Sequence, residues 1–145
     1  MKTRNVQRLG RDAAFTLIEM VLVLAIVALL VGASTVALVG IINSARYEAA
    51  LRKILSIETA LANYELDNRR LPTESQGLKA LVERPSAAPV PKRWQVYVEP
   101  LPEDPWGRNY VYRIPAEKSR KGYDLFSLGE DGVESTDDDI GNWGG

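Results

Sequence analysis

The strongest constraint in this sequence is an uncharged apolar stretch near its start. From Met20 to Ala45, 26 consecutive residues carry no charge. A helix of that length spans roughly 39 Å, more than the ~30 Å thickness of a bilayer core. Residues 1–14 hold four basic residues and one acid, as is typical of a leader that stays in the cytoplasm. We therefore predict a basic leader at residues 1–14 and the transmembrane half of a helix at residues 15–45.

Small residues stand before the apolar stretch and not behind it. Ala13 and Ala14 come directly ahead of Phe15, whereas an ordinary secretory signal carries its small residues after the apolar core. This order favours cleavage between Ala14 and Phe15, with the apolar stretch kept as an anchor. An uncleaved signal anchor is the alternative that composition leaves open.

Glu19 is an acid inside the apolar segment. A carboxylate at the membrane centre costs about 2.5–3.5 kcal/mol on insertion scales. One interpretation is that Glu19 lies near the interface or is protonated. The other is that it meets a cation in the membrane. Cleavage before Phe15 would create a free amine, and staggered packing would bring one copy's amine to Glu19 of its neighbour.

The polarity pattern changes after Asn43. Apolar and aromatic residues then recur every three or four positions, with charged residues between them, which predicts an amphipathic helix with one buried stripe. The predicted stripe consists of Tyr47, Leu51, Ile54, Ile57 or Leu61, and Tyr64. No breaker separates this pattern from the apolar stretch, so we predict one helix over residues 15–66. Residues 46–66 form its soluble half, and Asp67-Asn68 end it.

Residues 67–145 are predicted to form a small soluble head. Thr73 to Gln76 has the pattern of a capping box, which predicts a short helix after it. Six of the eight prolines lie from Pro85 to Pro105, so that stretch is predicted to be an extended loop.

Two aromatic and β-branched runs, residues 110–114 and 123–128, predict an antiparallel hairpin that covers the helix stripe. The predicted fold class is therefore α+β, with a long N-terminal helix packed on a small antiparallel sheet.

The composition argues against an enzyme. The chain has no Cys and no His, which removes thiolate nucleophiles and the commonest general base near neutral pH. No nucleophile motif and no acid–base pair in distinct environments is visible. The chain after its leader is acidic and its tyrosines fall on predicted core faces, so nucleic-acid binding is not predicted.

The segment from Glu130 to Asp139 holds six acidic residues and no basic one. A solvated loop is one interpretation. A hard-cation site is the other, because Gly129 and Gly132 allow a tight turn and a 79-residue head without disulfides gains from a metal. Oxygen ligands in a flexible loop suit Ca²⁺ better than Mg²⁺. The spacing does not fit an EF-hand, because Val133 occupies the second acidic position.

Several motifs resemble those of known families. Ala14-Phe15-Thr16-Leu17-Ile18-Glu19, followed by an apolar run, resembles the signal of type IV pilins and type II secretion pseudopilins. More specific motifs of the head resemble the major pseudopilins of the type II secretion system. These motifs are Asp104-Pro105-Trp106-Gly107, Tyr123-Asp124-Leu125-Phe126-Ser127-Leu128-Gly129 and Asp137-Asp138-Asp139-Ile140-Gly141-Asn142-Trp143.

The resemblance implies a type IV pilin-like fold and a role for individual residues. A prepilin peptidase would cut between Ala14 and Phe15 and methylate the new amine, and Glu19 would neutralise a neighbour's N-terminus during assembly. The family usually has Gly at the position of Ala14, and many members have Pro where this chain has Val36.

The resemblance also implies a structural Ca²⁺ in the last loop. Its ligands by position are the backbone oxygens of Leu128 and Val133 and the carboxylates of Asp131, Asp138 and Asp139. Asp137 is a substitute for one of the last two.

The function implied is that of a structural subunit of a secretion pseudopilus, which polymerises helically to drive export of folded proteins across the outer membrane. The implied partners are further copies, other pseudopilins, the inner-membrane assembly platform and the prepilin peptidase. The implied location is the inner membrane, single-pass, with a cytoplasmic N-terminus and a periplasmic head. A type IV pilin for adhesion, motility or DNA uptake is the alternative, although the chain lacks the usual Cys pair. A membrane-anchored enzyme or a soluble calcium module is a further alternative.

Overall fold

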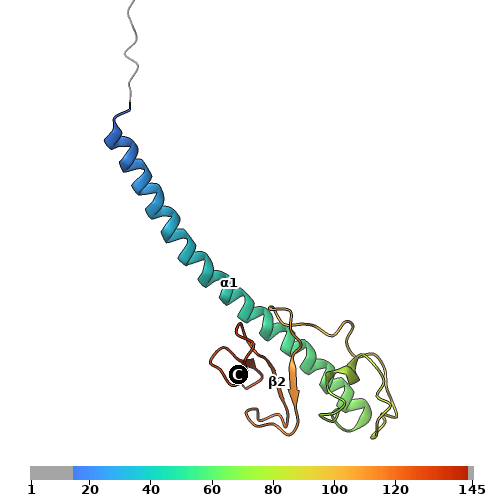
Figure 1. The fold of residues 1–145 in the computed structure, drawn as a ribbon. Helices are drawn as coiled ribbons and strands as arrows, with labels where there is room; N and C mark the ends of the chain where they lie inside the picture. Colours follow the sequence, from blue (N-terminus) through green and yellow to red (C-terminus); the bar gives the residue numbers. More distant parts are fainter. Residues whose placement is uncertain (1–14, 144–145) are drawn as a thin grey trace, which may run out of the picture. The chain divides into compact units, whose positions relative to one another are not determined.

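The structure, a computed structural model, describes residues 15–143, with the side chains of residues 33–39 outside the description (Figure 1). The chain forms two compact units, residues 1–41 and residues 42–145. Its elements in order are the helix α1 (Leu17–Asn68), the 3₁₀-helix η1 (Leu78–Leu81), and the strands β1 (Val111–Arg113), β2 (Asp124–Ser127) and β3 (Ile140–Gly141). The predicted α+β class with one long N-terminal helix is confirmed.

Both ends of α1 have local causes. At its start the Glu19 amide donates to the Thr16 carbonyl at 3.1 Å and to Thr16 Oγ1 at 3.3 Å, so Thr16 caps the first turn. At its end Arg69 has a left-handed φ of 60° and its amide donates to the Glu65 carbonyl at 2.7 Å. A left-handed residue just past the last turn stops an α-helix. The helix therefore ends at Asn68, as Asp67-Asn68 predicted.

The first unit contains the apolar start of α1. Every described side chain from Phe15 to Gly32 is exposed. Among the residues that the structure describes, no helical stretch has both the length and the hydropathy that a membrane crossing requires. The segment predicted to cross, residues 15–45, includes residues 33–39, and its crossing stays a prediction.

The sheet of the second unit has three antiparallel strands in the order β1-β2-β3 (Figure 1). Val111 of β1 lies opposite Phe126 of β2, and Phe126 lies opposite Gly141 of β3 on the other side. The predicted hairpin is thus confirmed. The third strand was not predicted, because two residues within a Gly-rich and acidic segment carry no alternating pattern.

The core of the second unit lies between α1 and the sheet. The buried α1 residues are Ala50, Ile54, Ile57, Ala60, Leu61 and Tyr64, and they join a cluster with Tyr110, Tyr112, Tyr123, Leu125 and Ile140. The Tyr110 hydroxyl donates to the Ala50 carbonyl at 3.3 Å. The hairpin therefore covers the helix stripe, as predicted. Tyr47 was wrongly placed in that stripe: it is 46% exposed, because the buried face begins almost one turn later, at Ala50.

The segment after α1 also follows the prediction in part. The Thr73 amide donates to Gln76 Oε1 at 3.1 Å and the Gln76 amide to Thr73 Oγ1 at 3.3 Å, so the capping box forms. The helix that follows is only η1, which buries Leu78 and Leu81. Residues 82–102 contain no helix or strand, in agreement with the proline-rich loop.

Candidate functional site

The N-terminal candidate site is described from Phe15 onward. Phe15 is 74% exposed, and Glu19 lies in the first turn of α1 with an exposed side chain. Within residues 15–143 the Glu19 carboxylate forms no ion pair and no hydrogen bond. Ala14, the other half of the predicted cleavage bond, lies outside the described residues, as does the leader at 1–14. The site therefore offers a carboxylate four positions after Phe15 that has no partner among the described residues.

The C-terminal candidate site is the loop that runs from Leu128 to Asp139, and it folds back on itself. The Gly132 amide donates to the Leu128 carbonyl at 3.1 Å, which closes a tight turn. Gly129 begins this turn with a left-handed φ of 64°. A Cβ added there would lie 2.4 Å from the Asp138 backbone oxygen. The two ends of the loop thus touch at a position that only glycine fits.

Asp138 is the central acceptor of the loop. Its Oδ2 accepts the amides of Glu130 at 2.6 Å and Asp131 at 3.0 Å, and its Oδ1 lies 2.6 Å from the Thr136 hydroxyl. The Thr136 hydroxyl and the Asp131 amide hold the pKa of Asp138 below its ordinary value. Asp138 is therefore ionised at neutral pH.

Thr136 lies among three of the five predicted ligands. Besides Asp138, its Oγ1 lies 3.4 Å from Asp131 Oδ1 and 3.0 Å from the Val133 carbonyl. A hydroxyl has one proton to donate and several acceptors surround it here. Asp131, Val133 and Asp138 are thus brought together around one polar atom. Thr136 was not singled out from the sequence, because a lone Thr in an acidic run carries no motif.

Asp139 holds the orphaned polar atom of the loop. Its side chain is 3% exposed, and its Oδ2 accepts the Ser135 amide at 2.9 Å and lies 3.3 Å from Lys118 Nζ. Its Oδ1 is buried without a hydrogen-bond partner among the described residues. A buried carboxylate oxygen without a hydrogen bond is costly, and such an oxygen is well suited to accept a bond from water or to bind a cation.

The donor set of the loop fits a hard cation. It offers only oxygens, from carboxylates and carbonyls, and Ca²⁺ prefers such ligands. The buried Asp139 Oδ1 is free to accept one. The predicted ligands are nevertheless not assembled into a cage: between residues 15 and 143 no three acidic side chains lie close enough together to hold a metal ion. The Leu128 carbonyl already accepts a hydrogen bond from the Gly132 amide. Asp137, the substitute ligand, has an exposed side chain.

A basic residue that was not predicted fastens this loop. Arg108 donates through Nη1 to the Gly129 carbonyl at 2.5 Å and through Nη2 to the Glu130 carbonyl at 2.8 Å. Asp104 accepts the Arg108 amide at 2.7 Å and the Ser127 hydroxyl at 2.6 Å. The sequence predicted a turn at Asp104-Pro105-Trp106-Gly107. Arg108 follows this turn directly, and that position was the only sequence signal for its role.

Glu58 is a second charged residue with several polar partners that was not predicted from the sequence. It is 9% exposed on the stripe side of α1. Its partners are Lys121, Tyr123 and Asn142. Burial and the nearby Glu58 carboxylate raise the pKa of the Tyr123 hydroxyl well above its ordinary value. The group joins the core to a recess that Leu51, Ile54, Leu55 and Gly141 also line.

The chain matches two protein families. A family described as "Type II secretion system (T2SS), protein G" matches residues 37–143. A "Prokaryotic N-terminal methylation motif" matches residues 9–35. The first match covers the described head and the second covers the start of α1.

Relatives and a solved structure are similar over most of the chain. The type II secretion system core protein G of Aeromonas hydrophila is 42% identical, and the matched region covers 92% of this chain and 93% of the relative. The protein of the same name from Pectobacterium carotovorum is also 42% identical, with coverages of 92% and 85%. The crystal structure of the major pseudopilin from the type 2 secretion system of enterohaemorrhagic Escherichia coli matches with a TM-score of 0.66 at 42% identity. It covers 72% of this chain and 87% of that one.

Proposed function

Because the chain belongs to the type II secretion system protein G family, we propose that it builds the secretion pseudopilus by polymerising through α1. It is a structural subunit and not an enzyme, like the pseudopilins that it resembles. It assembles with other pseudopilins and the secretion machinery. A type IV pilin for adhesion or motility is not favoured, because the family and the similar crystal structure are both of type II secretion.

One observation carries this proposal: the start of α1 is an exposed apolar surface. All described side chains of residues 15–32 are exposed, and most are Leu, Ile, Val or Ala. Burial of such side chains stabilises by about 25 cal/mol for each Å² removed from water. An apolar surface this large belongs in a bilayer before assembly and among other helices afterwards. We propose the inner membrane as the first place and the filament interior as the second.

Glu19 sets the register of the helices in this proposal. Cleavage between Ala14 and Phe15 leaves a cationic amine on Phe15, which would pair with Glu19 of the neighbouring copy. A carboxylate in an apolar environment is stabilised by an opposite charge and costly without one. Glu19 has no such charge among the described residues of its own chain. The lack of a counter-charge in this part of its own chain supports a cationic partner from a neighbouring copy.

Location and partners follow from the same scheme. The N-terminus lies in the cytoplasm, where the prepilin peptidase acts, and the head lies in the periplasm. The inner-membrane assembly platform extracts the subunits, and the growing filament drives folded proteins through the outer membrane. The basic charge of residues 1–14 supports this orientation.

The calcium proposal concerns the loop from Leu128 to Asp139. When bound, Ca²⁺ would supply positive charge that draws the loop carboxylates together. Asp139 Oδ1 and the acceptors around Thr136 would hold it. One oxygen of the Asp131 carboxylate and one of the Asp138 carboxylate already lie within hydrogen-bond distance of the Thr136 hydroxyl. Ca²⁺ would thereby fix the head surface that meets neighbouring subunits.

Glu19→Gln tests the polymerisation proposal. We expect the variant to reach the membrane fraction in normal amount but to form no filaments and to stop secretion. Glu48→Gln is the matched control, since Glu48 also lies on α1 and has only a 3.9 Å contact with Arg52. Electron microscopy of filaments and secretion into the medium are the measurements. Normal filaments from Glu19→Gln would refute the pairing role.

A further inference from the structure

We propose that four basic residues at the end of α1 bind the acidic loop of a second copy of this chain, so that charge holds neighbouring heads together. The basic cluster is Arg69, Arg70, Lys92 and Arg93, and the acidic loop is residues 130–139. This inference rests on the proposed polymerisation, because it concerns contacts between subunits of the filament. It adds a contact between heads to the packing of the helices.

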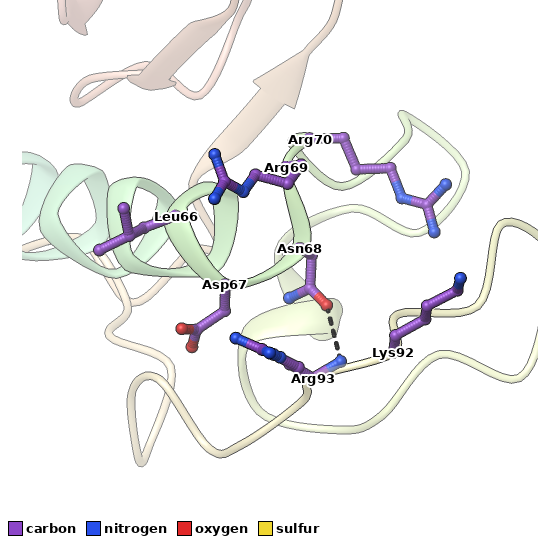
Figure 2. Close-up of a pocket in the computed structure, with 7 residues that line it drawn as sticks. All are labelled: Leu66, Asp67, Asn68, Arg69, Arg70, Lys92 and Arg93. Atoms are coloured by element: carbon purple, nitrogen blue, oxygen red, sulfur yellow. Dashed lines mark hydrogen bonds between the residues drawn. The ribbon is translucent and has the colours of Figure 1, made fainter.

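The basic cluster lines a recess of about 430 Å³ at the last residues of α1 (Figure 2). Arg69 and Arg70 follow directly after the helix, and Lys92 and Arg93 come from the proline-rich loop. The Arg93 amide donates to Asn68 Oδ1 at 3.2 Å, which ties the loop to the end of the helix. Two segments more than 20 residues apart in the sequence therefore contribute four basic residues to the lining of one recess.

The described part of the chain does not neutralise these cations. Among the residues from 15 to 143, none of the four forms an ion pair. Arg70 donates to the Val90 carbonyl at 3.1 Å, and its Nε is buried without a partner. The single acid of the recess, Asp67, already accepts the Tyr97 hydroxyl at 3.0 Å and Gln95 Nε2 at 3.1 Å. Glu65 lines an adjoining recess with Arg69, so two carboxylates lie near four cations. The surplus of like charges is repulsive, and an acidic partner relieves that repulsion.

The acidic loop has the complementary surplus. Glu134 and Asp139 are paired with Arg113 and Lys118. Glu130 and Asp137 are exposed, and within the described chain their carboxylates have neither an ion pair nor a hydrogen bond. Glu130 is outside the predicted calcium ligands. The loop thus keeps free carboxylates even when its other acids are engaged.

The two surfaces lie at different ends of one head. In Figure 1 the acidic loop, in brown and red, lies beside the part of α1 where the second unit begins, whereas α1 ends at the opposite end of the same unit. The contacts agree, because Asn142 just after the loop bonds Glu58, and Tyr110 reaches Ala50. A head with opposite charge at its two ends is complementary to a second copy of itself. Such a contact adds subunits head to tail, as an open filament requires.

A charge exchange in the full-length chain tests this contact. We expect Arg93→Glu alone and Glu130→Arg alone each to lower the filament yield about tenfold, because each puts like charges against one another. The double variant restores the opposite signs and is expected to recover the yield. Arg120→Glu is the control: Arg120 is exposed, lies outside the cluster and has no ion pair among the described residues. It is expected to assemble normally.

Crosslinking gives a second readout that does not depend on recovered yield. The chain has no Cys, so co-expressed Arg93→Cys and Glu130→Cys chains can crosslink only through the introduced cysteines. Each variant expressed alone, in which only like positions can pair, is expected to give no dimer. We expect a disulfide-linked dimer from filaments that contain both variants and none from Arg120→Cys with Glu130→Cys.

The outcomes separate the two proposals. Absence of filaments from the unaltered chain would overturn the proposed function. Filaments that form normally, with no dimer and no effect of charge exchange, would overturn only this inference. Loss of binding to vesicles of anionic lipid by Arg93→Glu, with filament yield unchanged, would also overturn it and assign the cluster to a membrane surface.

Discussion

Lys121 Nζ lies 2.9 Å from both carboxylate oxygens of Glu58, a residue that is 9% exposed. Asn142 Nδ2 donates to the same carboxylate at 3.2 Å. Glu58 belongs to α1, Lys121 to the hairpin connection and Asn142 to the segment after β3. One buried carboxylate therefore joins three parts of the chain that are far apart in the sequence, and it links the helix to the sheet that covers it.

Lys121→Met is expected to destabilise the second unit. The substitution leaves the Glu58 carboxylate buried without its cation, and loss of a hydrogen bond to a charged group costs about 1.5–3 kcal/mol. Lys121 is half exposed, so we expect the lower end of this range, as water partly replaces the ammonium. Urea unfolding followed by tryptophan fluorescence gives the free energy of unfolding. Arg120→Met, at the neighbouring position, is expected to change it by less than about 0.5 kcal/mol. Equal losses would contradict the prediction.

Asp124 is expected to make the fold sensitive to acid. Burial alone would raise the pKa of its carboxyl, but the amides of Glu117, Ser119 and Lys118 outweigh burial and lower it. A pKa below the unfolded value of about 3.9 means that the stabilisation is present above that pH and is lost as the pH falls through the folded pKa. We therefore expect Asp124→Asn to lower the free energy of unfolding at pH 7 and to lower it less at pH 3.

Urea unfolding at the two pH values measures this difference for Asp124→Asn. Glu83→Gln is the control, because its exposed side chain has no hydrogen bond or ion pair among the described residues. A loss for Asp124→Asn that is the same at pH 7 and pH 3 would show that the carboxylate's charge is not what holds the three amides.

Calcium is expected to raise the stability of the head. A ligand at 100 times its dissociation constant stabilises a protein by about 2.7 kcal/mol. Thermal unfolding of the full-length chain in detergent, with Ca²⁺, Mg²⁺ or chelator, measures the effect. We expect a shift with Ca²⁺ that Asp139→Asn abolishes and Glu99→Gln, at an exposed acid outside the loop, retains. Equal shifts in the two variants, or no shift at all, would leave the solvated-loop interpretation.

Gly129→Ala is expected to disrupt the acidic loop more than its backbone angle alone requires. Gly107 and Gly129 both have left-handed φ values, of 79° and 64°. A Cβ at Gly107 has nothing within 4 Å, whereas one at Gly129 would lie 2.4 Å from the Asp138 backbone oxygen. Left-handed geometry costs about 1–2 kcal/mol for a residue with a Cβ. Overpacking adds roughly 1–3 kcal/mol. We expect a lower unfolding temperature for Gly129→Ala than for Gly107→Ala. The reverse order would contradict the close contact at Gly129.

Elements with a repeating pattern were predictable from the sequence. The helix was found because apolar residues recur at its period, and the β1–β2 hairpin because two β-branched and aromatic runs flank a short connection. Periodicity does not reveal where a covering layer begins, so Tyr47 was placed in the stripe although it is exposed. The capping box at Thr73 was predicted correctly because both of its bonds are local.

Long-range polar contacts were not predictable in the same way. Arg108 binds carbonyls 21 and 22 residues away, and backbone carbonyls have no sequence signature. The burial of Glu58 was not predicted, because acidic residues are mostly exposed and the sequence does not show which cation pairs with this one. In the acidic loop, family resemblance singled out Asp131, Asp138 and Asp139. The hydroxyl of Thr136 that lies between two of them emerged only from the structure.

The position of Asn142 in the chain sets the order in which the fold can close. Its side chain accepts the Leu125 amide at 3.2 Å, and its own amide donates to the Leu125 carbonyl at 3.1 Å. Its bond to Glu58 spans 84 residues, and contacts so distant in the sequence form late. Ribosomes and export channels deliver a chain from its N-terminus, so α1 emerges long before the residue that completes its cover. The cover of the α1 stripe therefore stays incomplete, and within reach of chaperones or proteases, until residue 142 has been delivered.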